Sequence, residues 1–218
     1  MSRKIVRLTL DHLDALPSPC RSCLFWELDP VRRDKACGHE AEEKAAWVSM
    51  VLREWGSCGR VALVDGEVVG HMIWAPPVWV PSADGFATAP VGSDAVLLAT
   101  AHVDPAHRGG GLGRMLVQGM ARDLIERGGF RAVEAFGDTR GRHAGTCVLP
   151  EAFLGGVGFK TQRAHSTTPR MRMELRSALT WRDELEVALE RLLGVVRPHK
   201  QKTPAPTPKV TRSGRQAL

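Results

Sequence analysis

The chain has 218 residues, of which 43% are hydrophobic and 25% are charged, a balance typical of a folded globular protein. Its length predicts one domain, or one domain with a tail, and is sufficient to bury a core without disulfides or metals. No apolar run approaches the ~20 residues of a membrane-spanning helix, and the first residues lack a signal-peptide pattern, so we expect neither a transmembrane nor a secreted protein.

The positive charge is concentrated at one end of the chain. Residues 197–218 hold six of the 30 basic residues and none of the 24 acidic ones, so residues 1–196 carry no net charge. This stretch is also rich in proline and poor in apolar residues, and it cannot bury enough surface to offset its ordering entropy. We therefore predict a folded domain over residues 1–196 and a disordered basic tail over 197–218. Such a tail either solubilises the protein or makes weak contacts with nucleic acid or acidic surfaces.

The first half of the chain predicts a strand, two helices and a hairpin. Charged and β-branched residues alternate over residues 3–10, and Asp11 is placed to begin a short helix. Apolar residues at i, i+3, i+4 and i+7 predict a helix over residues 42–55. Asp-Gly separates two β-rich runs at 60–64 and 67–74, which is typical of a two-residue hairpin turn. A long loop rich in proline and small residues then follows.

The second half predicts a strand–helix–strand unit and a further strand. Residues 95–103 are nearly all apolar, as expected for a strand buried on both faces. An amphipathic helix follows and ends near Gly128, and strands are predicted over 130–136 and 171–175. A short helix over 150–154 lies between these strands, and Thr180 is placed to cap a last helix. Because a hairpin needs antiparallel pairing and a strand–helix–strand unit needs parallel pairing, we predict an α/β fold with a mixed central β-sheet flanked by helices.

The turn after the 95–103 strand carries the strongest chemical signal. Gly109, Gly110, Gly111 and Gly113 let a ligand approach the backbone N–H groups at a helix N-terminus, where the helix dipole favours an anion. Arg108 and Arg114 flank this turn as phosphate partners. The turn lacks the Gly-Lys-Ser/Thr ending of a P-loop and the third glycine of a dinucleotide fingerprint. Its pattern, Arg-x-x-Gly-x-Gly, therefore predicts a pyrophosphate site that is neither a P-loop nor a dinucleotide fingerprint.

This pattern resembles the GNAT family of N-acetyltransferases. The matching residues are Val103-Asp104-Pro105, Arg108-Gly109-Gly110-Gly111-Leu112-Gly113 and, downstream, Gly158-Phe159. The resemblance implies a GNAT-like fold over about residues 3–176 and the binding of acetyl-CoA as cosubstrate. It implies that the pyrophosphate lies on the backbone of residues 108–113, with Leu112 and Arg114 at the start of the helix, and that the pantetheine pairs with Ala101 and Val103. It also implies direct transfer of the acetyl group to an amine.

Two positions depart from the family pattern and leave the proton transfers open. Relatives carry a carboxylate or histidine where this chain has Leu97 and a tyrosine where it has Leu154, and the chain contains no tyrosine. Strand alternation predicts that His102 faces away from Leu97 and is a packed histidine. Cys147 is then the candidate acid for the leaving thiolate, with a small buried residue as the alternative interpretation, and Glu27 is the candidate base.

The segment around Cys20 to Glu27 is the candidate acceptor region, because the resemblance places it beside the substrate. Phe25, Trp26 and Glu27 would supply an aromatic wall with one carboxylate, which suits an amine, and Trp74 is placed to extend this wall. Core packing is the alternative for the aromatic residues. Cys20, Cys23, Cys37 and His39 are zinc-ligand types, but their spacing departs from common zinc sites, so we predict no metal site and keep zinc as the alternative.

Together these features predict a cytoplasmic, acetyl-CoA-dependent N-acetyltransferase that acts on an amine. The odd number of cysteines, five, agrees with a reducing compartment. The alternative is a CoA-sensing binding module without turnover, whose basic tail contacts nucleic acid or a protein partner. The sequence does not identify the acceptor, and a homodimer remains open.

We predict that the 197–218 tail contributes nothing to the folded domain. A chain that ends at Val196 should keep the melting temperature of the full chain and its turnover of a small amine, because the tail has too few apolar residues to add to a core. Differential scanning calorimetry of both chains tests this expectation. A large fall in melting temperature would mean that the tail docks on the domain.

Overall fold

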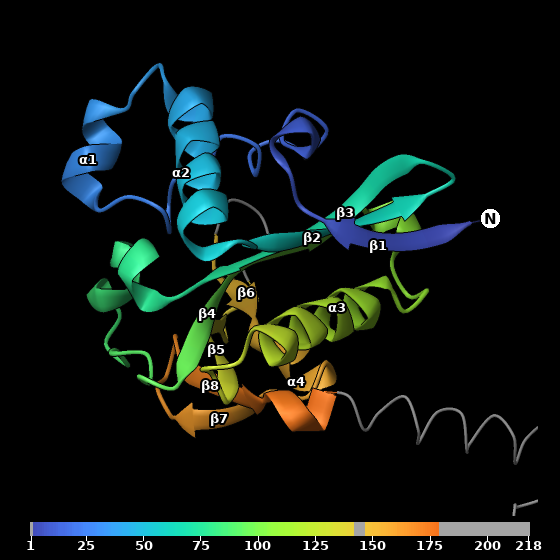
Figure 1. The fold of residues 1–218 in the computed structure, drawn as a ribbon. Helices are drawn as coiled ribbons and strands as arrows, with labels where there is room; N and C mark the ends of the chain where they lie inside the picture. Colours follow the sequence, from blue (N-terminus) through green and yellow to red (C-terminus); the bar gives the residue numbers. More distant parts are fainter. Residues whose placement is uncertain (1, 142–146, 179–218) are drawn as a thin grey trace, which may run out of the picture. The chain divides into compact units, whose positions relative to one another are not determined.

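The computed structural model describes residues 2–141 and 147–178 (Figure 1). The strands are β1 (Arg3–Arg7), β2 (Gly59–Val64), β3 (Glu67–Ala75), β4 (Ala95–Val103), β5 (Ala132–Asp138), β6 (Leu149–Pro150), β7 (Lys160–Arg163) and β8 (Arg170–Glu174). The α-helices are α1 (Pro30–Lys35), α2 (Glu40–Trp55), α3 (Leu112–Arg127) and α4 (Glu151–Gly156), and four short 3₁₀ helices are η1 (Leu10–His12), η2 (Pro77–Trp79), η3 (Pro81–Gly85) and η4 (Pro105–His107). The 197–218 tail and the helix expected after Thr180 lie outside the described residues.

The strands form one mixed sheet in the order β1-β2-β3-β4-β5-β8-β7, and β6 pairs with β5 beside this path. Neighbours along the path are antiparallel except β4 and β5, which are parallel and are connected by α3. The predicted hairpin forms with Asp65 and Gly66 at φ angles of 50° and 96°, the left-handed values that a tight two-residue turn requires. The predicted α/β class with a mixed sheet is therefore confirmed.

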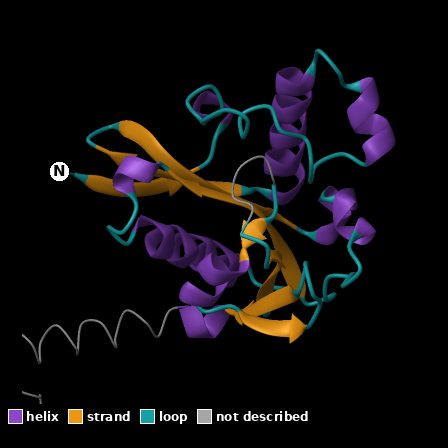
Figure 2. Cartoon of the chain, turned by 180° about the vertical axis from the view of Figure 1, so that it is seen from behind, coloured by secondary structure: helices purple, strands orange, loops and turns teal. Residues whose placement is uncertain are grey.

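Each face of the sheet is covered by its own helices and has its own core. Helices α1 and α2 lie on one face, and α3 and α4 lie on the other (Figures 1 and 2). Under α3 the core contains, among others, Met72, Trp74, Leu98, Leu116 and Met120. Under α2 it contains, among others, Trp47, Val51, Ile73, Leu97 and Ala99. Strand β4 contributes to both cores, which explains why its sequence is nearly all apolar.

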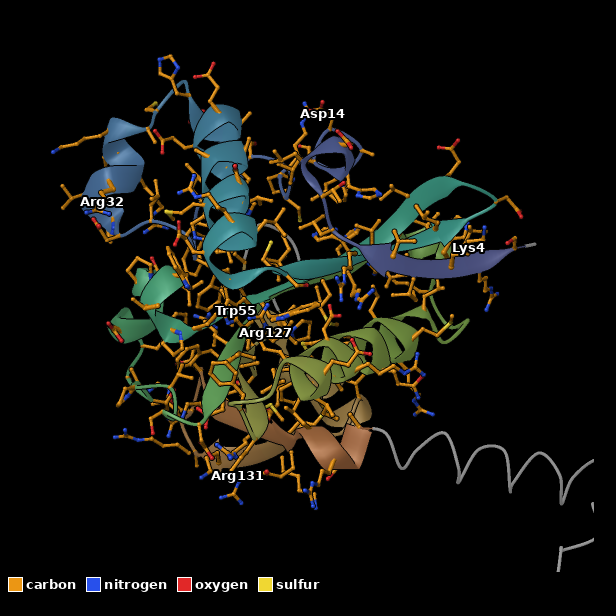
Figure 3. All side chains as sticks on the ribbon, in the orientation of Figure 1. Lys4, Asp14, Arg32, Trp55, Arg127 and Arg131 are labelled. Atoms are coloured by element: carbon orange, nitrogen blue, oxygen red, sulfur yellow. The ribbon has the colours of Figure 1, made fainter. Side chains whose placement is uncertain are left out.

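The C-terminal ends of α2 and α3 meet at the edge of the two layers. There the Arg127 guanidinium lies over the Trp55 ring at 4.5 Å from its centre, and the two labelled side chains are neighbours in Figure 3. Phe130 contacts the same Trp55 ring edge-on at a centroid distance of 6.1 Å. These contacts tie α2 to α3. No helix among residues 2–141 and 147–178 has the length and apolarity needed to cross a membrane.

A β-bulge at Ala99 changes which side chains of β4 face α2. Ile73 is opposite Thr100, whereas the next residue of β3, Trp74, is opposite Leu98, so Ala99 has no partner on β3. Because one extra residue reverses the alternation, His102 lies on the same face as Leu97. The sequence prediction that His102 faces away from Leu97 is therefore wrong, since simple alternation does not anticipate a bulge.

Candidate active site

The centre of the sheet contains a gap between β4 and β5. The two strands pair only from Ala95 to Leu97, although β4 continues to Val103 and β5 to Asp138. The other edge of β5 is occupied by β8 and then by a bond from the Thr139 N–H to the Thr167 carbonyl at 3.2 Å, so β6 pairs with β5 on the side of β4. Among the described strands, none pairs with the last six residues of β4 on this side. The result is an open strand edge that faces β6 across the gap.

The backbone of β4 presents two N–H groups to this gap. The N–H of Asp104 donates to the Val69 carbonyl at 2.8 Å and therefore points toward β3. Successive residues of a strand direct their polar groups to opposite sides, so the N–H groups of Ala101 and Val103 point into the gap. The Val103 carbonyl shares this direction and accepts a bond from Arg108 Nε at 2.8 Å. Ala101 and Val103 are the residues that the sequence resemblance associates with the pantetheine.

The glycine-rich turn follows β4 directly and ends in a helix N-terminus that is open to a ligand. Gly109 and Gly111 have φ angles of 76° and 82°, which favour glycine, and a Cβ on either would meet nothing within 4 Å. The N–H of Met115 donates to the Gly111 carbonyl at 3.0 Å, which is the first hydrogen bond of α3. The N–H groups that precede Met115 in the first turn therefore have no intrahelical acceptor. This cradle, residues 108–114, fits a pyrophosphate.

Two further residues shape the cradle, and sequence reasoning found neither contact. Arg3 of β1 donates from Nη1 to the Gly110 carbonyl at 2.7 Å, which adds a positive charge beside the turn. Because the peptide is planar, this bond points the N–H of Gly111 away from Arg3. At Gly113, a Cβ would lie 3.1 Å from the Phe153 ring, so this glycine allows α4 to pack on α3. No local pattern could have indicated contacts between residues this far apart in the sequence.

Trp26 and Phe25 occupy different environments on the α2 face. Trp26 is buried and stacks on Phe86 and Phe136 at centroid distances of 5.2 and 6.0 Å. Its Nε1 donates to the Cys147 carbonyl at 2.9 Å, which fixes the chain just before β6. Phe25 is half-buried beneath the Arg33 guanidinium, which lies 5.1 Å from the ring centre. Of the two aromatic side chains, Phe25 is the one that is partly exposed, and its role as an acceptor contact stays a prediction.

Glu27 is buried and forms an ion pair with the equally buried Lys44 of α2. Lys44 also donates to the Cys23 carbonyl at 3.1 Å, whereas Glu27 Oε2 has no hydrogen-bond partner among the described residues. Because Glu27 is buried, an acceptor ammonium could reach Oε2 only after neighbouring side chains moved. This placement favours a structural role for Glu27, and its predicted roles as base and as acceptor contact remain predictions.

Trp74 is completely buried in the core under α3, on the face opposite α2. An acceptor on the α2 face could reach it only if the sheet opened. The structure therefore favours core packing, which was the alternative interpretation for this residue. Leu154 is likewise completely buried in the same core.

Cys23 and Cys147 connect the segment before α1 to the chain before β6, at the border of the gap. Their sulfur atoms are 2.8 Å apart, and both residues are half-buried. The hydrogen bond between them lowers the pKa of the Cys23 thiol to about 6 and, together with burial, raises the pKa of the Cys147 thiol. Within residues 2–141 and 147–178, no three His, Cys, Asp or Glu side chains are arranged to hold a metal ion. The zinc alternative would need His39 and Cys37 as ligands. In the structure the His39 ring contacts Glu42 at 2.9 Å, and Cys37 is exposed.

His102 is a titratable side chain of β4 that lies on the α2 face of the sheet, beside the gap. It is half-buried and stacks on His71, with ring centroids 5.9 Å apart. Burial is the main cause that lowers the pKa of His102, and the neighbouring Arg108 lowers it further. Burial also lowers the pKa of the fully enclosed His71 to about 3. Both imidazoles are therefore neutral near pH 7, the state in which a histidine can accept a proton.

A groove of about 440 Å³ lies beside the N-terminus of α2. Its lining includes Leu13, Arg21, Ser22, Glu40 and Ala45. None of its lining residues belongs to the cradle or to β4. The candidate active site is therefore the gap between β4 and β5 and not this groove.

The sequence model of the acetyltransferase (GNAT) family matches residues 22–145, which is more than half of the chain. The protein therefore belongs to the GNAT family, and the resemblance stated from its motifs is confirmed. No curated protein matches the chain.

Several solved structures share the fold. The PaiA N-acetyltransferase from Thermoplasma acidophilum, in complex with coenzyme A, is 14% identical over 80% of this chain and 99% of its own, with a TM-score of 0.51. Ard1 from Thermoplasma volcanium is 15% identical over 80% and 98% of the two chains, with a TM-score of 0.51. AAC(6')-Ib, in complex with paromomycin and acetyl-CoA, is 16% identical over 83% and 97%, with a TM-score of 0.52. At this identity the similarity supports the fold alone.

We predict that Lys44→Met destabilises the protein by about 3–5 kcal/mol, because it leaves the Glu27 carboxylate buried without its partner. Urea unfolding measures this loss. The matched control is Arg53→Met, which breaks an exposed ion pair with Glu54 and should cost no more than about 1 kcal/mol. Equal losses for both variants would show that the buried pair is not important for stability.

Proposed function

We propose that the protein transfers the acetyl group of acetyl-CoA to an amine by direct attack of the amine on the thioester. The observation that carries this proposal is the open edge of β4 leading into the glycine-rich cradle. Family membership supports acetyl transfer in general. An N-acetyl product, the cytoplasmic location, a homodimer and contacts of the tail remain predictions.

The cradle and the strand edge suit the two polar parts of the cosubstrate. The pyrophosphate would accept hydrogen bonds from the N–H groups of the first turn of α3, with Arg108 and Arg3 supplying positive charge nearby. The pantetheine amides would pair with the gap-facing groups of Ala101 and Val103, as an added strand does at a sheet edge. A backbone N–H in this part of β4 would also polarise the thioester carbonyl and stabilise the tetrahedral oxyanion.

The amine must lose a proton before or during its attack. His102 is the side chain that best fits this task, because it lies on the α2 face of the same strand segment and is neutral near pH 7. Leu97, at the position where relatives carry a base, is completely buried. We therefore assign the base role to His102 ahead of Glu27, whose carboxylate is ion-paired with Lys44.

The departing thiolate needs a proton, and Cys147 remains our candidate for the acid. It precedes β6, which faces the open edge of β4 across the gap. Its raised pKa keeps the thiol protonated near pH 7. A protonated thiol is in the state that an acid requires, while the raised pKa makes transfer of its proton to the thiolate less favourable.

A CoA-sensing module without turnover is the second candidate function. It is favoured by the apolar side chains at Leu97 and Leu154, both completely buried, and by the absence of tyrosine. An assay of thiol release from acetyl-CoA over a panel of small, polycationic and peptide amines separates the two functions. Amine-dependent thiol release supports the transferase, and tight acetyl-CoA binding without release on any amine supports the sensor.

We predict that Gly111→Trp lowers acetyl-CoA affinity by about 10²-fold or more, because the side chain fills the cradle and removes charge-assisted hydrogen bonds. Isothermal titration calorimetry measures the affinity. Gly128→Trp is the matched control, since Gly128 also has a positive φ and open space around it but lies at the other end of α3. Gly111→Trp incurs a left-handed backbone strain of about 1–2 kcal/mol, and Gly128→Trp is strained at least as much, since its ψ of −179° lies in a region essentially restricted to glycine. Only Gly111→Trp should nevertheless lose affinity. Undiminished affinity of Gly111→Trp would contradict the location of the pyrophosphate.

We predict that His102→Gln lowers kcat/KM by ~10²–10⁴-fold and removes the acid limb of its pH profile. Because burial lowers the pKa of His102, the wild-type limb should have its midpoint below the ordinary histidine value of about 6.5. Activity is present above this pKa and is lost as the imidazole becomes protonated. His39→Gln serves as the control, because the His39 side chain is 69% exposed and contacts only the exposed Glu42 among the described residues. An unchanged profile in His102→Gln would exclude the base role.

A further inference from the structure

Cys23 and Cys147 are separated by 124 residues in the sequence, yet their sulfur atoms are 2.8 Å apart. This is closer than the ~3.5–4.0 Å of non-bonded carbon contacts and approaches the ~2.05 Å of a disulfide bond. The two residues come from different parts of the fold, the segment before α1 and the segment before β6. We propose that Cys23 and Cys147 are a modification site, a dithiol that a hydroperoxide converts to a reversible disulfide.

The surrounding contacts hold both cysteines in place without oxidation. The carbonyl of Cys23 accepts a bond from the buried Lys44 ammonium at 3.1 Å, and the carbonyl of Cys147 accepts one from Trp26 Nε1 at 2.9 Å. Lys44 and Trp26 are both buried, so the backbone of Cys23 and that of Cys147 are each anchored to the core. Formation of the bond therefore needs only a small closure of the two sulfur atoms.

The chemistry assigns different roles to the two sulfurs. Cys23 has the lowered pKa and is the nucleophile, since the thiolate is the reactive form. It attacks one oxygen of the peroxide, the O–O bond breaks, and a sulfenic acid forms with loss of hydroxide. Cys147 then attacks this sulfur, its proton and the sulfenic oxygen leave as water, and the S–S bond forms. The two sulfurs lose two electrons in total, and the peroxide gains them.

The remaining cysteines are poorer partners for Cys23. Cys58 is fully buried, so a hydroperoxide cannot reach its thiol. Cys20 precedes Cys23 by only three positions, yet within the described residues its sulfur atom is not at hydrogen-bond distance from the Cys23 sulfur, whereas that of Cys147 is. Cys37 is exposed and has no thiol contact among the described residues. The predicted product is therefore Cys23–Cys147 and not the Cys20–Cys23 bond that the Cys-x-x-Cys spacing suggests.

Peptide mapping of the full chain after oxidation tests this proposal. The reduced protein is treated with a small excess of hydrogen peroxide, alkylated, digested under non-reducing conditions and analysed by mass spectrometry. We expect three of the five thiols to remain open to alkylation under denaturing conditions, with a Cys23–Cys147 linked peptide that dithiothreitol removes. The linkage is read from peptide masses, so its outcome does not depend on any acetyl transfer.

Variants make the assignment specific. Cys37→Ser should form the same linked peptide as the wild type, whereas Cys23→Ser and Cys147→Ser should each lack it. A Cys20–Cys23 bond, an intermolecular Cys37 bond as the main product, or five free thiols after oxidation in the wild type would each overturn the proposal. Because the wild-type map alone decides between these results, the test holds even if one variant fails to fold.

Discussion

The candidate site depends on the short pairing between strands β4 and β5. Strands β4 and β5 are hydrogen-bonded only from Ala95 to Leu97, and beyond this point they separate. Their parallel pairing requires a crossover, and α3 supplies it, so the helix N-terminus lies directly after the unpaired end of β4. An open strand edge and an anion-binding helix terminus are thereby placed next to each other. Each feature alone is common, and their juxtaposition is what matches a long ligand with amides at one end and phosphates at the other.

Different contacts surround the gap on the two faces of the sheet. On one face, α3 and α4 pack around the cradle, with Gly113 allowing the approach of Phe153. On the other face, the segment before α1 contacts the chain before β6 through Trp26 and Cys147. The buried Lys44–Glu27 ion pair anchors this segment to α2. Replacing one partner of such a pair is expected to be costly, so the segment before α1 is held by charge as well as by apolar packing.

Sequence patterns predicted the elements that follow simple periodicity. The bounds of β4 agree with its apolar run, α3 ends next to the predicted glycine, and the Asp65-Gly66 turn forms as expected. Strand β7 was not predicted, because all four of its residues are exposed and it has no apolar alternation. The short helix α1 buries no side chain and likewise gives no periodic signal.

The site was predictable where it is made of backbone and less so where it is made of side chains. The glycine spacing identified the cradle, since its chemistry depends on local conformation. The direction of His102 was predicted wrongly, because a bulge at Ala99 reverses the alternation. The contacts of Arg3 with Gly110 and of Cys23 with Cys147 join residues more than 100 positions apart, so only the tertiary structure brings them together.

We propose that acetyl-CoA lies along the open edge of β4 with its pyrophosphate in the cradle. Amide hydrogen exchange of the full chain, with and without saturating acetyl-CoA, tests it most directly. We expect slower exchange at Ala101, Val103 and residues 109–114 when acetyl-CoA is bound, and no change in β7. Unchanged exchange at these amides while calorimetry shows acetyl-CoA to be bound would contradict it.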